Sequence, residues 1–390
     1  MARIALVLIL SLVLATSVAA EQLLVEKREF VTEDFTTLSG KTIPEVRFGW
    51  EAYGELNEAR DNVILVTHFF SGTSHAAGRY RADDAEPGYW DAIIGPGKAI
   101  DTERYYVISS DTLVNANVHD EHVITTGPAS INPATGEPWG LDFPVVTIRD
   151  FVEVQRRLLD SLGIDKLHAV IGASMGSFQA IEWAVAYPER VERVVPVIGG
   201  ARMGAWEIAL IDSWARPIRL DPNWNNGDYY GDERPLEGLT TSLMLITRNA
   251  LHPDFFKLQF PDHANLPPAA LEHIDGQFAV TEWLHDRARA RAEVSDANHV
   301  LYLARASQLF VAGHDNDPAA ALERIEAPVL WLPSENDLLL RPELARSAHG
   351  QLLEAGKQSE LVTLKGAMGH LNGLAAIEQA REKLRQFLSD

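Results

Sequence analysis

The chain of 390 residues contains no cysteine. Disulfide bonds, thiolate metal sites, a cysteine nucleophile and a lipid-modified cysteine anchor are therefore excluded. Positive charge is also scarce, because 34 Lys and Arg stand against 55 Asp and Glu and give a formal net charge of −21. Since phosphate backbones are bound by clustered positive charge, nucleic acid is not expected as a partner. After the first twenty residues, no run approaches the roughly 18 apolar residues of a membrane-spanning helix.

The first twenty residues have the pattern of a secretory signal. Arg3 gives a short positive start, and Ile4–Ala15 is an apolar run of twelve residues. Small residues at Val18–Ala20 then fit a peptidase site before Glu21. An apolar run this short is typical of a signal core, and an uncleaved membrane anchor is the alternative. We therefore expect an exported protein, periplasmic or secreted, with no stable membrane insertion after signal removal.

Beyond this predicted signal, strand patterns alternate with helix patterns. The predicted strands are Phe35–Leu38, Val46–Tyr53, Val63–Thr67, Tyr105–Ser110, Leu167–Ile171, Val194–Ile198, Val329–Leu332 and Leu361–Leu364. The predicted helices are Ile148–Leu162, which Thr147 caps, Met175–Ala186 and Gly373–Leu388. Such alternation predicts an α/β fold with a mostly parallel sheet and helices on both faces.

One long segment interrupts the alternation. Residues 201–319 have helical patterns but no convincing buried strand, and they contain four of the nine tryptophans. We interpret this segment as a helical insertion that lies over the sheet as a lid, shapes the substrate pocket and excludes water. The predicted organisation is a signal at residues 1–20 and one α/β domain at 21–390 that carries the insertion.

The most specific motif is Gly172–Gly176, whose sequence GASMG has the pattern G-x-S-x-G. A predicted strand precedes it and a predicted helix follows it, which is the context of a nucleophile elbow in the α/β-hydrolase fold. The turn is so tight that glycine is the steric solution on either side of the serine. The sequence therefore predicts an α/β-hydrolase with Ser174 as the nucleophile. The alternative is a glycine-rich turn with an idle serine.

A serine hydroxyl needs a base, and that base needs a group to orient it. In this fold the order along the chain is serine, acid and histidine. Of the thirteen histidines, only His370 follows the last predicted strand, in a glycine-rich loop before the final helix. Asp337 follows the strand Val329–Leu332 by a short loop, and Glu335 is the competing acid. We predict Asp337, because the loop needs a turn before the side chain can reach back.

An acyl-transfer site also needs donors for the oxyanion. The amide of Met175 is predicted to be one, because it follows Ser174 at the start of a helix. The second donor is expected in the loop after the strand Val63–Thr67. We assign it to the amide of Phe70, with Phe69 as the alternative donor and as a candidate wall of the substrate pocket.

Two polar clusters invite a different interpretation. His119–His122 has the residue types of a metal site, but no further ligand follows at a recognised spacing. His314–Asp317 lacks the glycine and the distal glutamate of a calcium loop. We interpret both clusters as solvated loops, and we expect neither a metal nor an organic cofactor.

Several further motifs resemble those of one family, the homoserine O-acetyltransferase group of α/β-hydrolases. The resemblance covers most of the chain after the signal. Its carriers are Trp90-Asp91, Gly95–Gly97, Asp101–Tyr105, Thr126–Pro133, Phe143–Asp150, Ser174–Gly176, Gln179-Ala180, Glu182–Ala184, Tyr187-Pro188, Asn223-Trp224, Gly227–Tyr229 and Leu301–Leu303. The resemblance implies a triad of Ser174, Asp337 and His370 with oxyanion donors at Phe70 and Met175. It also implies a helical lid that often forms a homodimer contact.

The chain departs from this family at two positions that concern the acyl acceptor. Members that acylate homoserine usually carry an arginine after a Gly-Leu pair in the lid, where this chain has Leu243. They also carry an aspartate directly after the catalytic histidine, where this chain has Leu371. Two leucines leave an apolar wall that would bury the charges of a zwitterionic acceptor unpaired. Arg248 lies nearby, and a small shift of the alignment would restore a cation.

The function expected from the sequence is hydrolysis of small, fairly apolar carboxylic esters through an acyl-enzyme. Two features favour water as the second nucleophile: the missing acceptor contacts, and an export signal that would keep the enzyme from cytoplasmic acyl-coenzyme A. The alternative is an O-acyltransferase that uses the same triad with a hydroxyl acceptor. A catalytically dead binding module and a peptidase are further alternatives, and nothing in the sequence specifically favours either.

Overall fold

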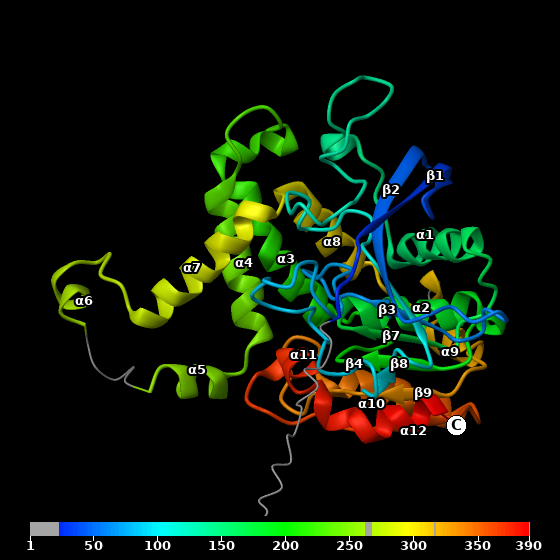
Figure 1. Cartoon of the computed structure of the whole chain (residues 1–390). Coiled ribbons are helices and arrows are strands. Elements are labelled where there is room, and N and C mark those ends of the chain that lie inside the picture. Colours follow the sequence, from blue (N-terminus) through cyan, green and yellow to red (C-terminus); the bar gives the residue numbers. More distant parts are fainter. Residues whose placement is uncertain (1–22, 262–266, 316, 390) are drawn as a thin grey trace, which may run out of the picture.

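The computed structural model describes residues 23–261, 267–315 and 317–389 (Figure 1). The predicted signal at residues 1–20 lies outside the described residues. Among the described residues, no helix is long and apolar enough to cross a membrane.

An eight-stranded sheet forms the centre of the molecule, in the order β1-β2-β6-β3-β7-β8-β9-β10. These strands are β1 (Arg28–Thr36), β2 (Thr42–Tyr53), β3 (Val63–Thr67), β6 (Tyr106–Ser110), β7 (Ala169–Ala173), β8 (Val194–Val197), β9 (Val329–Trp331) and β10 (Ser359–Leu361). The pairs β1–β2 and β2–β6 are antiparallel, and every later pair is parallel. A separate parallel pair is formed by β4 (Ile94–Gly95) and β5 (Ile100–Asp101). The predicted mostly parallel sheet is confirmed.

Both faces of the sheet are covered. The helices are α1 (Ile148–Ser161), α2 (Met175–Ala186), α3 (Ala205–Leu220), α4 (Leu236–Ala250), α5 (Pro253–Gln259), α6 (Pro268–Glu272), α7 (Ala279–Val294), α8 (Ala297–Gln308), α9 (Pro318–Glu323), α10 (Pro342–Glu354), α11 (Asn372–Ala375) and α12 (Arg381–Ser389). Along β3, Val63 and Leu65 pack into one apolar core, and Ile64 and Val66 pack into a second. The first core contains residues of α1 and α2, and the second contains residues of α12. Because successive side chains point to opposite faces, a strand buried on both faces is apolar throughout.

Several elements differ from those predicted, among them the last strand, which is β10 at Ser359–Leu361 and not Leu361–Leu364. The first strand ends at Thr36, because the chain turns between Thr37 and Lys41; the prediction of Phe35–Leu38 placed it too late. The predicted closing helix Gly373–Leu388 is interrupted at Ala376, so that α11 and α12 are separate. Helix α10, between β9 and β10, has no counterpart among the predicted elements.

The described part of the helical insertion (residues 201–319) follows β8 and precedes β9. It contains α3 to α8 and the start of α9. Figure 1 shows α3, α4, α7 and α8 gathered beside the sheet, with α6 farthest from it. The two ends of the insertion pair with each other at its base. Met203 N donates to Phe310 O at 3.0 Å, and Ala312 N donates to Ala201 O at 2.8 Å.

Candidate active site

Ser174 stands at the turn between β7 and α2, with φ 57° and ψ −119°. A side chain at Gly172 would meet Thr67 Oγ1 at 2.1 Å, and one at Gly176 would meet Thr67 O at 2.1 Å. Both glycines therefore let the elbow press against the end of β3. A non-glycine residue at positive φ is costly, and the cost is commonly found at functional sites.

The hydroxyl of Ser174 lies at one end of a chain of hydrogen bonds. Its Oγ is 2.8 Å from Nε2 of His370, and Nδ1 of the same ring is 2.6 Å from Oδ2 of Asp337. The three residues are buried, with 8%, 5% and 2% of their surfaces exposed. The structure thus brings together the serine, histidine and aspartate singled out in the sequence, although they lie as much as 196 positions apart.

The carboxylate of Asp337 is fixed by the backbone that follows it. Its Oδ1 accepts hydrogen bonds from the N–H groups of Leu339 at 2.8 Å and Leu340 at 3.0 Å. This leaves Oδ2 for the histidine. The competing acid, Glu335, has an exposed side chain, so Asp337 is the acid that contacts His370.

Side-chain hydrogen bonds hold the loop that carries His370. Ser334 Oγ donates to Gly369 O at 2.7 Å, and Asn372 Nδ2 donates to Ser334 Oγ at 3.0 Å. Asn336 Nδ2 donates to Gly366 O at 2.8 Å. Gly369 has φ +63°, which favours glycine at this bend. The acid and the histidine are therefore linked by their loops as well as by their own contact.

The loop after β3 is fixed in a similar way, and it holds the predicted oxyanion donor Phe70. Burial lowers the pKa of His68 and so favours its neutral ring, whose Nδ1 lies 2.7 Å from Phe69 O. Asn115 Nδ2 donates to Gly72 O at 3.0 Å, and Asn117 Nδ2 donates to Ser71 O at 3.1 Å. Met175 begins α2, so its N–H has no acceptor within the helix.

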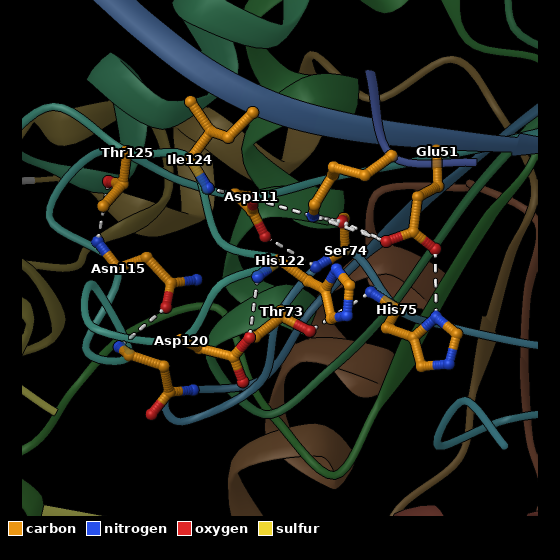
Figure 2. A network of polar contacts seen from close by, with 12 residues as sticks. Glu51, Thr73, Ser74, His75, Asp111, Asn115, Asp120, His122, Ile124 and Thr125 are labelled. Carbon is orange, nitrogen blue, oxygen red and sulfur yellow. Dashed lines mark hydrogen bonds and ion pairs between the residues drawn. The ribbon is translucent and has the colours of Figure 1, made fainter. Parts of the chain in front are cut away.

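A buried polar network supports the far end of this loop, and Figure 2 shows its members around Glu51 and Asp111. Glu51 accepts from Ser74 Oγ at 2.7 Å, and Asp111 accepts from Ser74 N at 2.8 Å. Lys27 Nζ lies 3.4 Å from Glu51 and 3.0 Å from Asp111. Burial alone would raise the pKa of Glu51, but the hydrogen bond from His75 and the charge of Lys27 lower it to about 2. This network was not predicted, since its members lie far apart in the sequence.

A cavity of about 280 Å³ opens above Ser174. Phe69, Phe70, Met175 and Leu371 line it, as do Ser174 and His370. The helical insertion supplies much of the remaining wall. Its lining residues are Met203, Ile211, Trp214, Ile246, Thr247, Ala250, Arg287, Arg291 and Ser307. The insertion therefore covers the predicted nucleophile.

One predicted pocket residue requires correction. Leu243 is 1% exposed and belongs to the apolar core, and it is not among the residues that line the cavity. The side of α4 that faces the cavity bears Ile246, Thr247 and Ala250 instead. The predicted apolar wall is confirmed for Phe69 and Leu371, but the expectation that the pocket is uncharged is wrong, because Arg287 and Arg291 of α7 also line the cavity. The alternating arginines of α7 are typical of a solvated helix, so the sequence carried no signal for this placement.

Neither polar cluster of the sequence forms a metal site in the part of the chain that the structure describes, where no group of three or more His, Cys, Asp or Glu is suitably placed. His122 stacks on Tyr80 with ring centroids 3.9 Å apart. His119 Nε2 lies 4.0 Å from Asp296. These side chains have packing partners of their own.

A serine on a strand–turn–helix elbow, in contact with a histidine and an acid above a mostly parallel sheet, defines the α/β-hydrolase class of enzymes. The family model described as the alpha/beta hydrolase fold matches residues 98–371. Within this class, the chain belongs to the homoserine O-acetyltransferase-like family, as its motifs indicated.

The relatives of this family extend over nearly the whole chain. The homoserine O-acetyltransferase of Symbiobacterium thermophilum is 40% identical over 357 residues, which is 90% of this chain and 91% of that protein. The crystal structure of esterase E22 is 57% identical with a TM-score of 0.92, covering 94% of this chain and 100% of that chain. The crystal structure of homoserine O-acetyltransferase from Bacillus anthracis is 38% identical with a TM-score of 0.91, and the match covers 94% of this chain and 98% of that chain.

Proposed function

We propose that this protein is a serine carboxylic ester hydrolase that acts through an acyl-enzyme on small esters. The observation that carries the proposal is the Ser174–His370–Asp337 chain of hydrogen bonds at the floor of a cavity whose described lining includes no Asp or Glu for the ammonium group of an amino acid acceptor. The esterase E22, at 57% identity, supports the same assignment.

In the proposed mechanism, His370 Nε2 takes the proton of Ser174 as Oγ attacks the ester carbonyl. Asp337 stabilises the imidazolium, and the N–H groups of Phe70 and Met175 hold the oxyanion. His370 then protonates the leaving alkoxide. In the second half-reaction the histidine takes a proton from water, which attacks the acyl-enzyme and releases the acid and the free serine.

The residue next to His370 favours water over homoserine as the second nucleophile. Leu371 lines the cavity, and the cavity wall contains no Asp or Glu among the described residues. The ammonium group of homoserine would thus enter without a counter-charge, at a cost of several kcal/mol by order of magnitude.

The second candidate function is O-acyl transfer to a hydroxyl acceptor, with the same triad. The names of the curated relatives favour it, since those compared at 34–40% identity are homoserine O-acetyltransferases. Both functions pass through an acyl-enzyme, and they differ in the acyl donor and in the nucleophile that attacks the acyl-enzyme.

A paired assay on the purified protein separates the two functions. One reaction contains phenyl acetate in water, and the other contains acetyl-coenzyme A with homoserine and is followed by release of free thiol. We expect hydrolysis of the ester and little homoserine-dependent thiol release. Fast thiol release with negligible ester hydrolysis would reverse the assignment.

We also propose that the protein is exported and that its mature chain begins at Glu21. The basis is the signal pattern of residues 1–20 alone. Cell fractionation followed by N-terminal sequencing tests it. Recovery of chains that begin at Met1 from the cytoplasm would refute export.

A further inference from the structure

The helical insertion places an unpaired cation at the wall of the cavity. Arg291 of α7 lines the cavity, and its Nη2 atom is buried without a hydrogen-bond partner. Its Nη1 atom donates to Thr247 Oγ1 at 2.9 Å, and no ion pair joins it to a carboxylate of the described residues. A guanidinium removed from water without an anion is costly, so its position calls for an explanation.

This cation keeps its charge at neutral pH. Burial lowers the pKa of Arg291 to about 10, and the positive charge of Arg287 adds to the shift. Arg287 lines the same cavity, with its guanidinium carbon 5.9 Å from the ring centroid of Trp283. Two positive side chains of one helix therefore face the cavity, and no acidic side chain of the residues that the structure describes lines it.

Other polar atoms of the same wall also lack partners. Trp214 Nε1 and Ser307 Oγ belong to lining residues, and both atoms are buried without a hydrogen bond. The indole N–H can only donate, and the serine hydroxyl can donate. Together with Arg291 Nη2 they are donors from three helices, α3, α8 and α7. Donors of this kind are satisfied by acceptor oxygens, such as those of a carboxylate.

We propose that this wall is a subsite for a carboxylate of the substrate, with Arg291 as the residue that selects it. The inference rests on the proposed ester hydrolysis and narrows its substrate class to esters that carry a negative charge away from the scissile bond. The carboxylate belongs to the acyl part, as in a monoester of a dicarboxylic acid, or to the alcohol part, as in the acyl ester of a hydroxy acid.

Two matched pairs of esters distinguish these sources. For the alcohol part, 4-acetoxybenzoate is compared with phenyl acetate. For the acyl part, the phenyl monoester of glutaric acid is compared with phenyl pentanoate. We expect the wild-type protein to show at least a tenfold higher kcat/KM for the charged ester in one of the pairs. That pair shows whether the recognised carboxylate belongs to the alcohol part or to the acyl part.

Substitutions of Arg291 then test whether this residue selects the charged esters. Arg291→Met should lower the charged-to-neutral ratio of kcat/KM at least tenfold, and Arg291→Lys should restore part of it, because a cation is present again. Arg289→Met is the matched control, since Arg289 lies on the same helix and pairs with Glu237 and Glu293. It should keep the wild-type ratio. The proposal is overturned if the wild-type protein has the same kcat/KM for charged and neutral esters. It is also overturned if Arg291→Met leaves the charged-to-neutral ratio of kcat/KM unchanged.

Binding tests the subsite without any turnover, and it needs only the wild-type protein. Benzoate should raise its melting temperature, and the uncharged benzamide should not. If phenyl acetate is hydrolysed but benzoate gives no shift, the subsite is refuted and the proposed function stands. If benzoate binds but none of the esters is hydrolysed, the proposed function fails and the anion site remains.

Discussion

Ser174 combines a strained backbone with a hydroxyl that is already in contact with its base. The strain is sustained because Gly172 and Gly176 allow the turn to pack against Thr67. The base is held in turn by Asp337, whose other oxygen is occupied by two backbone N–H groups. The reacting geometry is therefore built before a substrate arrives, which is how such sites lower the barrier.

Ser174→Ala removes the only atom of this arrangement that forms the acyl-enzyme. We expect kcat for phenyl acetate to fall at least about a thousandfold, with a residual rate from the oxyanion donors. The release of phenol measures it. As a control, an organophosphate should label the wild-type protein at Ser174 and leave the variant unlabelled. Hydrolysis at the wild-type rate would exclude Ser174 as nucleophile.

Leu371→Asp supplies a counter-charge for an acceptor ammonium beside His370. Because Arg291 already faces the cavity, we expect this single change to raise homoserine-dependent thiol release from acetyl-coenzyme A about tenfold or more. Leu371→Asn is the matched neutral control and should show no such gain. Equal rates for the two variants would mean that the charge next to His370 does not decide the acceptor.

For single residues, the sequence predicted correctly those roles that follow from chain order and a local motif. It predicted poorly those that depend on the direction in which a side chain points. Ser174, Asp337 and His370 follow from order and context. Leu243 was misplaced because a family position gives a residue number and not the direction of its side chain. Arg291 was missed because a lack of partners is visible only in three dimensions.

Among the elements, α1 shows how one side chain can join two segments. Asp150 Oδ2 accepts from Thr147 N at 2.7 Å at the start of the helix, and Oδ1 accepts from Leu38 N at 2.6 Å in the β1–β2 turn. Asp150 is 2% exposed, and burial raises its pKa. The predicted cap at Thr147 is thus completed by a neighbour three residues later.

Asp150→Ala should lower the free energy of unfolding by about 2 kcal/mol, because it leaves two backbone donors without their acceptor. Urea unfolding followed by circular dichroism measures the change. Glu58→Ala, at an exposed position, is the control and should stay within about 0.5 kcal/mol of wild type. A similar small effect of Asp150→Ala would contradict the role of this side chain.

The errors in predicting elements also have physical causes. The closing helix was predicted as continuous because its apolar pattern is continuous. In the structure, the Gln379 side chain donates to Lys365 O and accepts from Lys365 N, which ties this segment to a preceding loop. The periodicity of apolar residues reports burial, and it does not report such competing hydrogen bonds.

For the whole molecule, the buried groups determine how stability responds to acid. Burial lowers the pKa of His68 and His299 from the usual 6.5, so stability falls as the pH drops below about 6.5 and these rings must charge. The pKa of Glu51 is about 2 in the folded protein, against the ordinary value of 4.5 for a glutamate in the unfolded chain. Its contribution is therefore present above pH 4.5 and is lost as the pH falls toward 2.

We expect the melting temperature to decline in two stages over these pH ranges. Glu51→Gln should flatten the stage between pH 4.5 and 2, because the side chain no longer takes up a proton on unfolding. Scanning calorimetry of wild type and variant at matched pH values measures both slopes. Equal slopes below pH 4.5 would show that Glu51 does not carry this stage.

The backbone pairing between the two ends of the helical insertion also has a consequence for the evolution of such an enzyme. Its ends are joined by an isolated bridge between Arg202 and Val311, so about a hundred intervening residues leave and rejoin the rest of the molecule at one neck. Ser174 lies before that neck, and Asp337 and His370 lie after it. The insertion is therefore a cassette: grafting one from a relative would exchange substrate preference while the bond-breaking residues stay in place.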